Sequence, residues 1–381
     1  MFIVTAGLPE YELYSGSFYY TVHKISVWCI PMNCLHDNQS FAFASDNYAG
    51  IHPKILQALM VANGGHLPAY GADVYTIALR QKIKQLFGEE AEAFPVFNGT
   101  GANITALQAL LPRWGAVICA DSAHIQCDEG VAPEHMAGVK LLTIATTDGK
   151  LTPQLVAKQA YGFGTEHRAQ PAVVYISQTT ELGTCYSVAE IRALADYCHQ
   201  HNMKLYMDGA RLANALVAEN TDVRTMIADT GVDMLNLGGT KNGMLQGECI
   251  ISMCADTHAA MPYLRKINAQ LGSKMRFISA QFLAWLEDDL WLSLAANSNL
   301  MAARLAASLA GIQNITLTRK TQANAVFAVL PAAARTRLHQ LFHFYDWDEV
   351  KGEVRWMTSF DTTAEQVDAF VAAIRQAVAK T

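Results

Sequence analysis

The sequence is short of charged residues. Only 16% of its 381 residues are charged, whereas about 25% is usual for a soluble domain. Its 28 Lys and Arg and 34 Asp and Glu give a net charge of -6, and they form no block of one sign. Nucleic acids and anionic membranes attract clustered Lys and Arg. We therefore expect neither as a partner.

Paired cysteines and long apolar runs are also missing. The 8 cysteines are scattered and form no CxxC pair, which argues against a zinc ribbon or a redox motif. No stretch offers the roughly 18 uninterrupted apolar residues of a membrane span. The first residues lack the basic region and apolar run of a signal peptide. We therefore expect a cytoplasmic protein without a metal site, whose cysteines are small core residues.

Apolar residues, in contrast, are abundant at 51%, which excludes a disordered chain. Residues 1–31 are aromatic without a clear period, so we expect an atypical extension. It is either the product of a misplaced start codon or an arm that packs on a partner. We then expect a large α/β domain over residues 32–285, and an interdomain helix with a small α+β domain over residues 286–381. The low charge also suggests a subunit interface, because interface cores lose charged residues.

Short apolar runs alternate with helical patterns along the first two thirds of the chain. Runs that predict strands are 94–97, 116–120, 140–145, 172–177, 204–207 and 247–253. Patterns that predict helices are 53–63, 74–87, a segment ending at 111, 153–160 and 188–201. This alternation predicts an α/β fold with a mostly parallel sheet and helices on both faces.

The last third of the chain has a different composition and a different pattern of predicted elements. Residues 262–312 are rich in Ala and Leu and predict a long helical region with one or more breaks. Beyond it we expect strands at 315–318, 325–330, 342–345 and 353–358, and helices at 332–341 and 363–379. This mixture predicts the small C-terminal α+β domain.

Two motifs lie next to predicted strands in the first half of the chain. Asn98-Gly-Thr-Gly-Ala-Asn103 is a glycine-rich turn between a strand and a helix, where backbone N–H groups can hold an anion. An ordinary turn explains it equally well when it is taken alone. Asp121-Ser-Ala-His-Ile125 directly follows a strand. His124 is therefore a candidate base, metal ligand or cofactor-stacking ring, although a lone histidine is more often structural.

Two further motifs carry an acid and a lysine. Tyr206-Met-Asp-Gly-Ala-Arg211 ends a strand in Asp208, at the sheet edge where ligands bind in parallel sheets. The alternative role of Asp208 is a helix N-cap. Leu237-Gly-Gly-Thr-Lys-Asn-Gly243 places Lys241 among glycines. A desolvated lysine loses its proton more readily and can form a Schiff base, whereas a surface turn would leave it an ordinary lysine.

Together the four motifs match the needs of one cofactor. Pyridoxal phosphate requires a lysine for a Schiff base, an acid on its pyridine nitrogen and a phosphate cradle. The acid keeps the ring nitrogen protonated, so that the ring accepts electrons from a breaking bond at Cα. We therefore predict pyridoxal 5'-phosphate as the cofactor.

The motifs also resemble those of a known family, the threonine aldolases of low-specificity type. These enzymes belong to the β-eliminating lyase group of fold-type I pyridoxal-phosphate enzymes. The similarity runs from about Ser45 to about Arg355. It is carried by Asp208-Gly-Ala-Arg211, Gly238-Gly-Thr-Lys-Asn-Gly243, Thr180-Glu-Leu-Gly-Thr184 and Leu271-Gly-Ser-Lys-Met-Arg276.

The resemblance implies a role for each matching residue. Lys241 would form the Schiff base, Asp208 would pair with the pyridine nitrogen, and His124 would stack on the ring near the substrate's β-hydroxyl. His124 is the first candidate for the base, and a water held by the phosphate is the alternative. Gly99, Thr100, Gly101 and Arg276 would bind the phosphate. Arg211, Arg355 and Ser45 would bind the substrate carboxylate, and Arg211 would also border the cofactor.

The resemblance further implies cleavage of threonine-like β-hydroxy amino acids to glycine and an aldehyde, acetaldehyde in the case of threonine. It implies a homo-oligomer, a dimer or a homotetrameric dimer of dimers. Two other functions stay open. One is a β-eliminating lyase of the tryptophanase or tyrosine phenol-lyase kind, and the other is a non-catalytic protein that keeps the cofactor.

One segment departs from the family pattern. After the histidine, many relatives continue with an acid and then Ala-Gly-Gly, whereas this chain reads Cys127-Asp-Glu-Gly-Val-Ala-Pro-Glu-His135. Because the loop borders the substrate side chain in the family, the substrate range is left open. His135 is a second candidate for contact with the hydroxyl, and a solvated loop histidine is the simpler explanation. The preferred configuration and the natural aldehyde also stay open.

Overall fold

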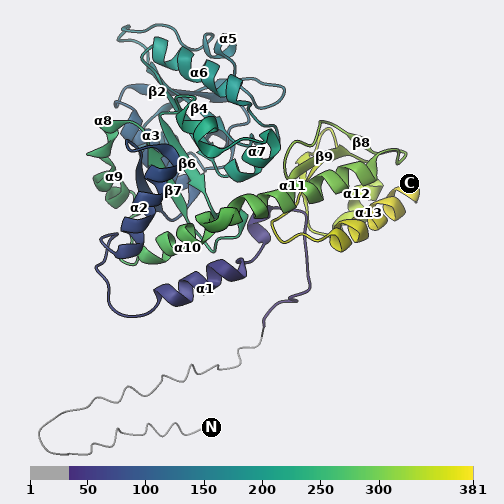
Figure 1. Ribbon diagram of the computed structural model, residues 1–381. Coiled ribbons are helices and arrows are strands. Elements are labelled where there is room, and N and C mark those ends of the chain that lie inside the picture. Colours follow the sequence, from purple (N-terminus) through teal and green to yellow (C-terminus); the bar gives the residue numbers. More distant parts are fainter. Residues whose placement is uncertain (1–33, 381) are drawn as a thin grey trace, which may run out of the picture. The chain divides into compact units, whose positions relative to one another are not determined.

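A computed structural model describes residues 34–380 (Figure 1). The chain divides into two units, Met1–Ser40 and Phe41–Thr381, and the description below concerns the second. The expected extension over residues 1–31 lies outside the described residues. No helix within residues 34–380 is long and apolar enough to cross a membrane.

A large mixed sheet forms the centre of the second unit. Within the described residues it has seven strands in the order β1-β7-β6-β5-β4-β2-β3. Their bounds are β1 Glu92–Val96, β2 Gly115–Ala120, β3 Lys140–Ile144, β4 Gln170–Ser177, β5 Lys204–Gly209, β6 Met234–Gly238 and β7 Glu248–Ser252. Strand β7 is antiparallel to both of its neighbours, and all other pairs are parallel. The prediction of a mostly parallel sheet is confirmed.

Helices and helical turns connect these strands. The helices are α1 Pro53–Ala62, α2 Val74–Phe87, α3 Gly99–Leu110, α4 His124–Cys127, α5 Pro153–Val156, α6 Val188–Gln200, α7 Leu212–Glu219, α8 Ala255–His258, α9 Met261–Ile267 and α10 Arg276–Leu286. The short turns are η1 Asp46–Tyr48, η2 Pro133–Ala137, η3 Arg224–Ala228, η4 Thr240–Asn242 and η5 Glu287–Asp289. Side-chain caps fix where several of these helices begin. Ser187 and Glu190, for example, form a capping box at the N-terminus of α6.

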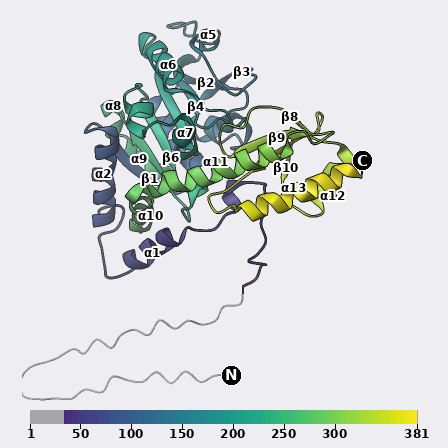
Figure 2. The ribbon, with the colours of Figure 1, turned by 45° about the vertical axis from the view of Figure 1, so that its right-hand side comes forward.

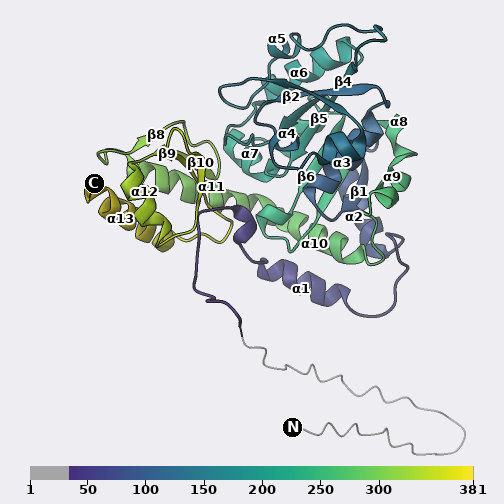
Figure 3. The same cartoon turned by 180° about the vertical axis from the view of Figure 1, so that it is seen from behind.

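Helices cover both faces of the sheet, as expected for parallel strands. On β2, Val117 and Cys119 belong to the buried cluster that includes Ala102 of α3. Ile118 and Ala120 face the other way and belong to the larger cluster. Figures 1 and 3 show the sheet from its two sides. The predicted fold class is therefore confirmed.

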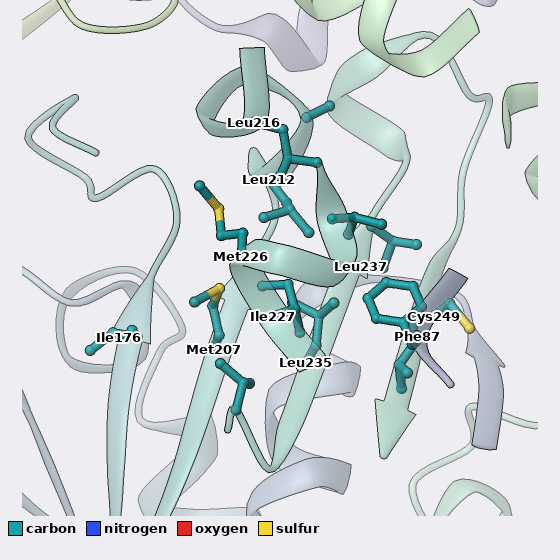
Figure 4. Packing of buried hydrophobic residues seen from close by; sticks show 14 of the residues in the cluster. Phe87, Ile176, Met207, Leu212, Leu216, Met226, Ile227, Leu235, Leu237 and Cys249 are labelled. Carbon is teal, nitrogen blue, oxygen red and sulfur yellow. The ribbon is translucent and has the colours of Figure 1, made fainter. Parts of the chain in front are cut away.

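The larger cluster packs α7 and η3 onto the strands that carry the acid and the lysine motifs. Figure 4 shows Leu212 and Leu216 of α7 and Ile227 of η3 next to Leu235 and Leu237 of β6. All five side chains are fully buried or nearly so. This packing fixes the end of β5 and the start of β6, because α7 follows β5 and η3 precedes β6 in the chain.

The C-terminal part has its own antiparallel sheet. Within residues 34–380 this sheet has four strands in the order β10-β11-β9-β8. Its elements are α11 Leu290–Leu309, β8 Thr316–Leu317, β9 Ala325–Val329, α12 Ala332–His339, β10 Tyr345–Asp348, β11 Glu353–Met357 and α13 Ala364–Ala379. Figure 2 shows α11 running from α10 toward α12 and α13. The boundary at residue 285 between the two domains stays a prediction.

Two expectations for this part need comment. The helical region at 262–312 is broken as expected, at residues 268–275 and again at η5, where Asp288 and Asp289 have φ of 48° and 52°. The strand expected at 342–345 is instead β10, Tyr345–Asp348. Phe342 and Phe344 pack into the C-terminal core ahead of the strand, and pairing with β11 begins only at Tyr345.

The segment before α1 is tied to the C-terminal core. The Phe43 ring stacks on that of Phe370 with 4.2 Å between centroids. The backbone N–H of Met357 donates to the Phe43 carbonyl at 2.8 Å. These contacts place Ser45 and Asp46 close to β11.

Candidate active site

The four motifs follow strands that end at the same edge of the sheet. Strands β1, β2, β5 and β6 run in the same direction, since β7 is antiparallel to both β1 and β6. Ser177, Asp208 and Asn236 are register partners on adjacent strands β4, β5 and β6. The carboxyl edge of a parallel sheet is where ligands bind in such folds. The predicted site is therefore located at this edge.

The glycine-rich turn begins helix α3. Asn98 is the N-cap, and its Oδ1 accepts from the Gly101 N–H at 2.8 Å. A Cβ atom at Gly101 would lie 2.2 Å from the Gln270 side chain, so glycine is required there for packing. Because the Gly101 N–H already serves the cap, the groups that this helix start leaves for an anion are those of Gly99 and Thr100.

Asp208 lies one residue before the end of β5 and accepts three hydrogen bonds. Its Oδ1 accepts from the Ala210 N–H at 2.9 Å. Its Oδ2 accepts from the Tyr175 hydroxyl at 2.9 Å and from Asn103 Nδ2 at 3.1 Å. Burial raises the pKa of Tyr175 well above its usual value, so the phenol stays a donor. The carboxylate of Asp208 is thus buried and held in a fixed orientation.

His124 begins the short helix α4. Its backbone N–H donates to Glu181 at 2.9 Å, and its ring Nδ1 lies 2.7 Å from Glu129 Oε1. The hydrogen bond to Glu129 raises the pKa of His124 above its ordinary value, with a smaller contribution from the Asp208 charge and against the effect of burial. The histidine is therefore part of a charged network and is not a lone ring.

Lys241 lies in the turn η4, directly after β6. It is half-buried and donates no hydrogen bond within residues 34–380. Burial, followed by the positive charge of Arg211, lowers the pKa of Lys241 below that of an ordinary lysine. The carboxylates of Asp46 and Asp208 act in the opposite direction. A lowered pKa makes the neutral, nucleophilic amine more available.

Arg211 follows β5 and forms an ion pair that the sequence analysis did not foresee. Its Nε and Nη2 donate to the two carboxylate oxygens of Asp46 at 2.6 and 2.8 Å. Asn324 donates a third hydrogen bond to Asp46 at 3.0 Å. Burial alone would raise the pKa of Asp46, but the charge and hydrogen bonds of Arg211 lower it below its ordinary value.

Arg355 lies on β11 beside this ion pair. Burial, followed by the charge of Arg211, lowers its pKa to about 10. Its Nε is buried without a hydrogen-bond partner in the described part of the chain, and its guanidinium lies 4.8 Å from the Trp347 ring centroid. Ser45 is buried nearby as the N-cap of η1, where its Oγ accepts from the Asn47 N–H. An anion at this position would relieve the positive charge of Arg355.

Arg276 and His135 form no hydrogen bond with the other predicted site residues within residues 34–380. Arg276 begins α10, and its Nη1 donates to the Gly65 carbonyl at 3.4 Å. No hydrogen bond among residues 34–380 joins Arg276 to Lys241 or Asp208. His135 is exposed on η2. Both roles stay predictions.

Several polar residues of the site were missed by the sequence analysis. They are Asp46, Asn103, Glu129, Tyr175, Glu181, Asn236 and Glu248. Asn103, Glu129 and Glu181 lie within the sequence segments singled out by their motifs, although no role was predicted for them. Asn236 and Glu248 carried a different signal, since each is a polar residue in an apolar strand. Asn236 is fully buried, and both polar atoms of its side chain lack partners in the described range. Burial raises the pKa of Glu248 to about 7.

Comparison with known proteins places this geometry in a family. The model of the β-eliminating lyase family matches residues 42–332. A low specificity L-threonine aldolase of Pseudomonas aeruginosa is 40% identical over 338 residues, which cover 87% of this chain and 96% of that protein. The chain belongs to the β-eliminating lyase family, and the resemblance to the threonine aldolases is confirmed.

Solved structures agree with this assignment. A threonine aldolase of Leishmania major superposes with a TM-score of 0.84 at 31% identity, covering 89% of this chain and 100% of that one. An aspartate aminotransferase of Thermus thermophilus superposes with a TM-score of 0.64 at 16% identity, covering 88% and 90%. The second similarity concerns the fold alone. The predicted fold-type I architecture is thus confirmed.

Proposed function

We propose that this chain is a pyridoxal-phosphate-dependent lyase that cleaves threonine-like β-hydroxy amino acids to glycine and an aldehyde. One observation carries the proposal. Lys241, with its lowered pKa, stands at the same sheet edge as Asp208 and the start of α3. This occurs in a chain that is 40% identical to a low specificity L-threonine aldolase.

The residues at this edge fit pyridoxal phosphate. Lys241 would hold its aldehyde carbon, Asp208 its ring nitrogen, and the N–H groups of Gly99 and Thr100 its phosphate. The fully buried Asn236 amide supports this fit, because its Nδ2 lies 4.0 Å from the position that a Gly99 Cβ would occupy and lacks a partner in the described chain. When bound, the cofactor supplies an electron sink for the breaking Cα–Cβ bond.

The protein's own groups would bind and orient the substrate. The buried, unpartnered Nε of Arg355 suits the amino-acid carboxylate, as does its charge, which burial and Arg211 disfavour more than Asp46 and Asp128 favour it. Arg211 uses Nε and Nη2 on Asp46, so only its Nη1 could add a second contact. Ser45 is buried at the same place. Fixing the carboxylate orients the Cα–Cβ bond for cleavage.

The removal of the β-hydroxyl proton would fall to a histidine, and the cofactor would be held by the lysine. His124 Nε2 would take the proton of the β-hydroxyl, because Nδ1 is occupied by Glu129. Lys241, whose amine is more readily deprotonated than usual, would hold the cofactor. The loop from Cys127 to His135 would border the substrate side chain.

A product assay tests the proposal. The purified protein, supplied with pyridoxal phosphate, is incubated separately with L-threonine, L-allo-threonine and L-tryptophan. We expect glycine and acetaldehyde from one or both threonine isomers, and the ratio of their rates gives the stereochemical preference. Pyruvate and ammonia would instead indicate a β-eliminating lyase of the tryptophanase kind. A coloured protein without turnover would indicate a non-catalytic binder.

We further propose a cytoplasmic homo-oligomer, a dimer or a dimer of dimers. Large apolar side chains are exposed on helices that flank the large sheet, namely Met60 and Val61 on α1, Val74 on α2, and Tyr263 and Ile267 on α9. Exposed apolar groups of this kind favour a subunit interface. Light scattering coupled to size-exclusion chromatography measures the subunit number, and a monomer at micromolar concentration would contradict the proposal.

A further inference from the structure

An acid of the loop after α4 is buried against the candidate base. The Glu129 side chain is 0% exposed, whereas that of His124 is 37% exposed. Glu129 Oε1 lies 2.7 Å from His124 Nδ1 and 2.6 Å from Asn103 Nδ2. A buried acid is costly unless it is hydrogen-bonded. Glu129 therefore stays in place because the histidine and the amide both approach it.

The Asn103 amide joins this acid to the acid at the end of β5. Its Nδ2 donates to Glu129 Oε1 and to Asp208 Oδ2, and its Oδ1 accepts from the Tyr206 hydroxyl at 2.7 Å. Burial raises the pKa of Tyr206 well above its usual value, so Tyr206 is the donor. A flipped amide would turn its oxygen toward two carboxylates. The observed orientation is therefore the one that satisfies all three partners.

This arrangement determines which nitrogen of His124 carries a proton. Glu129 Oε1 accepts from Asn103, and a carboxylate can only accept. The 2.7 Å contact therefore requires His124 Nδ1 to donate. The other nitrogen, Nε2, is left to exchange protons with a ligand, and a histidine is fixed in this way wherever a carboxylate orients it for proton transfer.

We propose that Glu129 is a positioning residue that holds His124 as the Nδ1–H tautomer, and that Asn103 ties this pair to Asp208. Only the expected effect on catalysis rests on the proposed function. The tautomer of His124 can be measured in the protein without any turnover. The Glu129 side chain is fully buried against His124 and Asn103, so its proposed role is exerted through His124. Glu129 acts by directing Nε2 toward the substrate and by stabilising the imidazolium that forms when Nε2 takes up a proton.

The charges around His124 set the expected pH dependence. Glu129 and Asp208 raise its pKa, and Lys241 lowers it. Glu181 accepts from its backbone N–H. A base works only in its deprotonated form, so the acid limb of kcat/KM follows the pKa of His124. Removal of the Glu129 charge should move this limb to lower pH while it lowers the maximum rate.

The first experiment measures the tautomer in the wild-type protein without cofactor. Long-range nitrogen–proton correlation spectra distinguish Nδ1–H from Nε2–H imidazoles, and His124→Asn identifies the signal. We expect neutral His124 to be the Nδ1–H form. An Nε2–H form would overturn the proposal. This result does not depend on whether the protein cleaves threonine, so failure here is separate from failure of the proposed function.

The second experiment compares Glu129→Gln with Asp128→Asn. Asp128 is the exposed neighbour in the same loop, so its variant removes the same charge without touching the His124 hydrogen bond. We expect Glu129→Gln to lower the pKa of His124 and to reduce kcat/KM about 100-fold, which is the low end for a general acid–base group. Asp128→Asn should leave the His124 titration unchanged, and Glu129→Asp should recover part of the rate.

An unchanged His124 titration in a folded Glu129→Gln protein would overturn the proposal, whatever happens to the rate. A Glu129→Gln protein with a reduced kcat/KM but an unshifted acid limb in its pH profile would also overturn the proposal. That result would indicate a general loss of structure at the site and not a change in the His124 pKa. If Glu129→Gln does not fold, the wild-type tautomer decides the question alone.

Discussion

The Arg211 guanidinium and the Asp46 carboxylate form an ion pair with two parallel hydrogen bonds, Nε to Oδ2 at 2.6 Å and Nη2 to Oδ1 at 2.8 Å. Only 14% of the Arg211 side chain and 1% of the Asp46 side chain are exposed. The two residues are 165 positions apart. The pair therefore fastens the segment before α1 to the end of β5, and both partners depend on each other for charge balance.

Asp46→Asn should be strongly destabilising, because it leaves the buried Arg211 charge without its partner. We expect a loss of about 3 kcal/mol or more in the free energy of unfolding, measured by urea denaturation at pH 7. Asp368→Asn is the control, since its two-bonded pair with Arg304 is exposed and should contribute little.

The same variant has a predictable pH dependence. The pKa of Asp46 is lowered in the folded protein from its ordinary value of 3.8. Its stabilising effect is therefore complete above pH 3.8 and is lost as the pH falls through the lower folded pKa. The difference between wild type and variant should be constant from pH 7 to pH 5 and shrink in more acidic solution. A difference that disappears already near pH 6 would contradict this account.

Lys241→Ala should abolish turnover, because it removes the amine proposed to hold the cofactor covalently. We expect borohydride reduction to fix pyridoxal phosphate on the wild-type peptide that contains Lys241, and mass spectrometry should find no such label in the variant. Lys274→Ala is a control lysine on the segment before α10. Labelling of Lys241→Ala at another residue would show that the assignment is wrong.

Arg355→Ala should weaken substrate binding far more than cofactor binding. The guanidinium has a buried, unpartnered Nε, and its removal takes away the group proposed for the carboxylate. A contact of this kind contributes about 2 kcal/mol, or roughly a 30-fold rise in KM. Cofactor affinity is followed by absorbance, and Arg375→Ala on the exposed face of α13 serves as control. An unchanged apparent affinity for threonine would refute the role.

Glu248→Gln should stabilise the cofactor-free protein in alkaline solution. Burial raises the pKa of Glu248 from 4.5 to about 7, so the folded state favours the protonated acid. Its contribution is favourable below pH 4.5 and is lost as the pH rises through 7. The shift corresponds to at most about 3 kcal/mol. The melting temperature of the variant should exceed that of wild type more at pH 9 than at pH 5, and a gap that is equal at both values would exclude this explanation.

The sequence was most informative where chemistry follows a strand directly. Asp208 directly follows an apolar run, and Lys241 lies within a glycine-rich motif. The carboxyl ends of parallel strands bring such positions to one edge of the sheet. Strand β6 was not predicted, because Asn236 interrupts its short apolar run and the glycines begin at once. Its polar interruption belongs to the site, and for this reason the periodic pattern fails there.

The remaining contacts depend on distant parts of the chain. Glu129 reaches His124 only through the course of its loop, and Asn103 meets Asp208 across 105 positions. The family pattern places an acid after the histidine, but this loop carries two adjacent acids, Asp128 and Glu129, and the sequence alone does not indicate which of them contacts the ring. The Arg211–Asp46 pair likewise has no local signal, because a charged residue followed by a short helical turn is common in solvated loops.

The stacking of Phe43 on Phe370 has a practical consequence for protein engineering. A shortened version of the chain that starts at α1 would still contain every strand of the large sheet and all of the lysine and aspartate motifs. It would nevertheless lose an aromatic ring from the C-terminal core, together with Ser45 and Asp46 from the ligand edge. Expression boundaries, affinity tags and fusion joints should therefore be placed so that Phe41–Tyr48 is retained, since these few residues serve two distant regions at once.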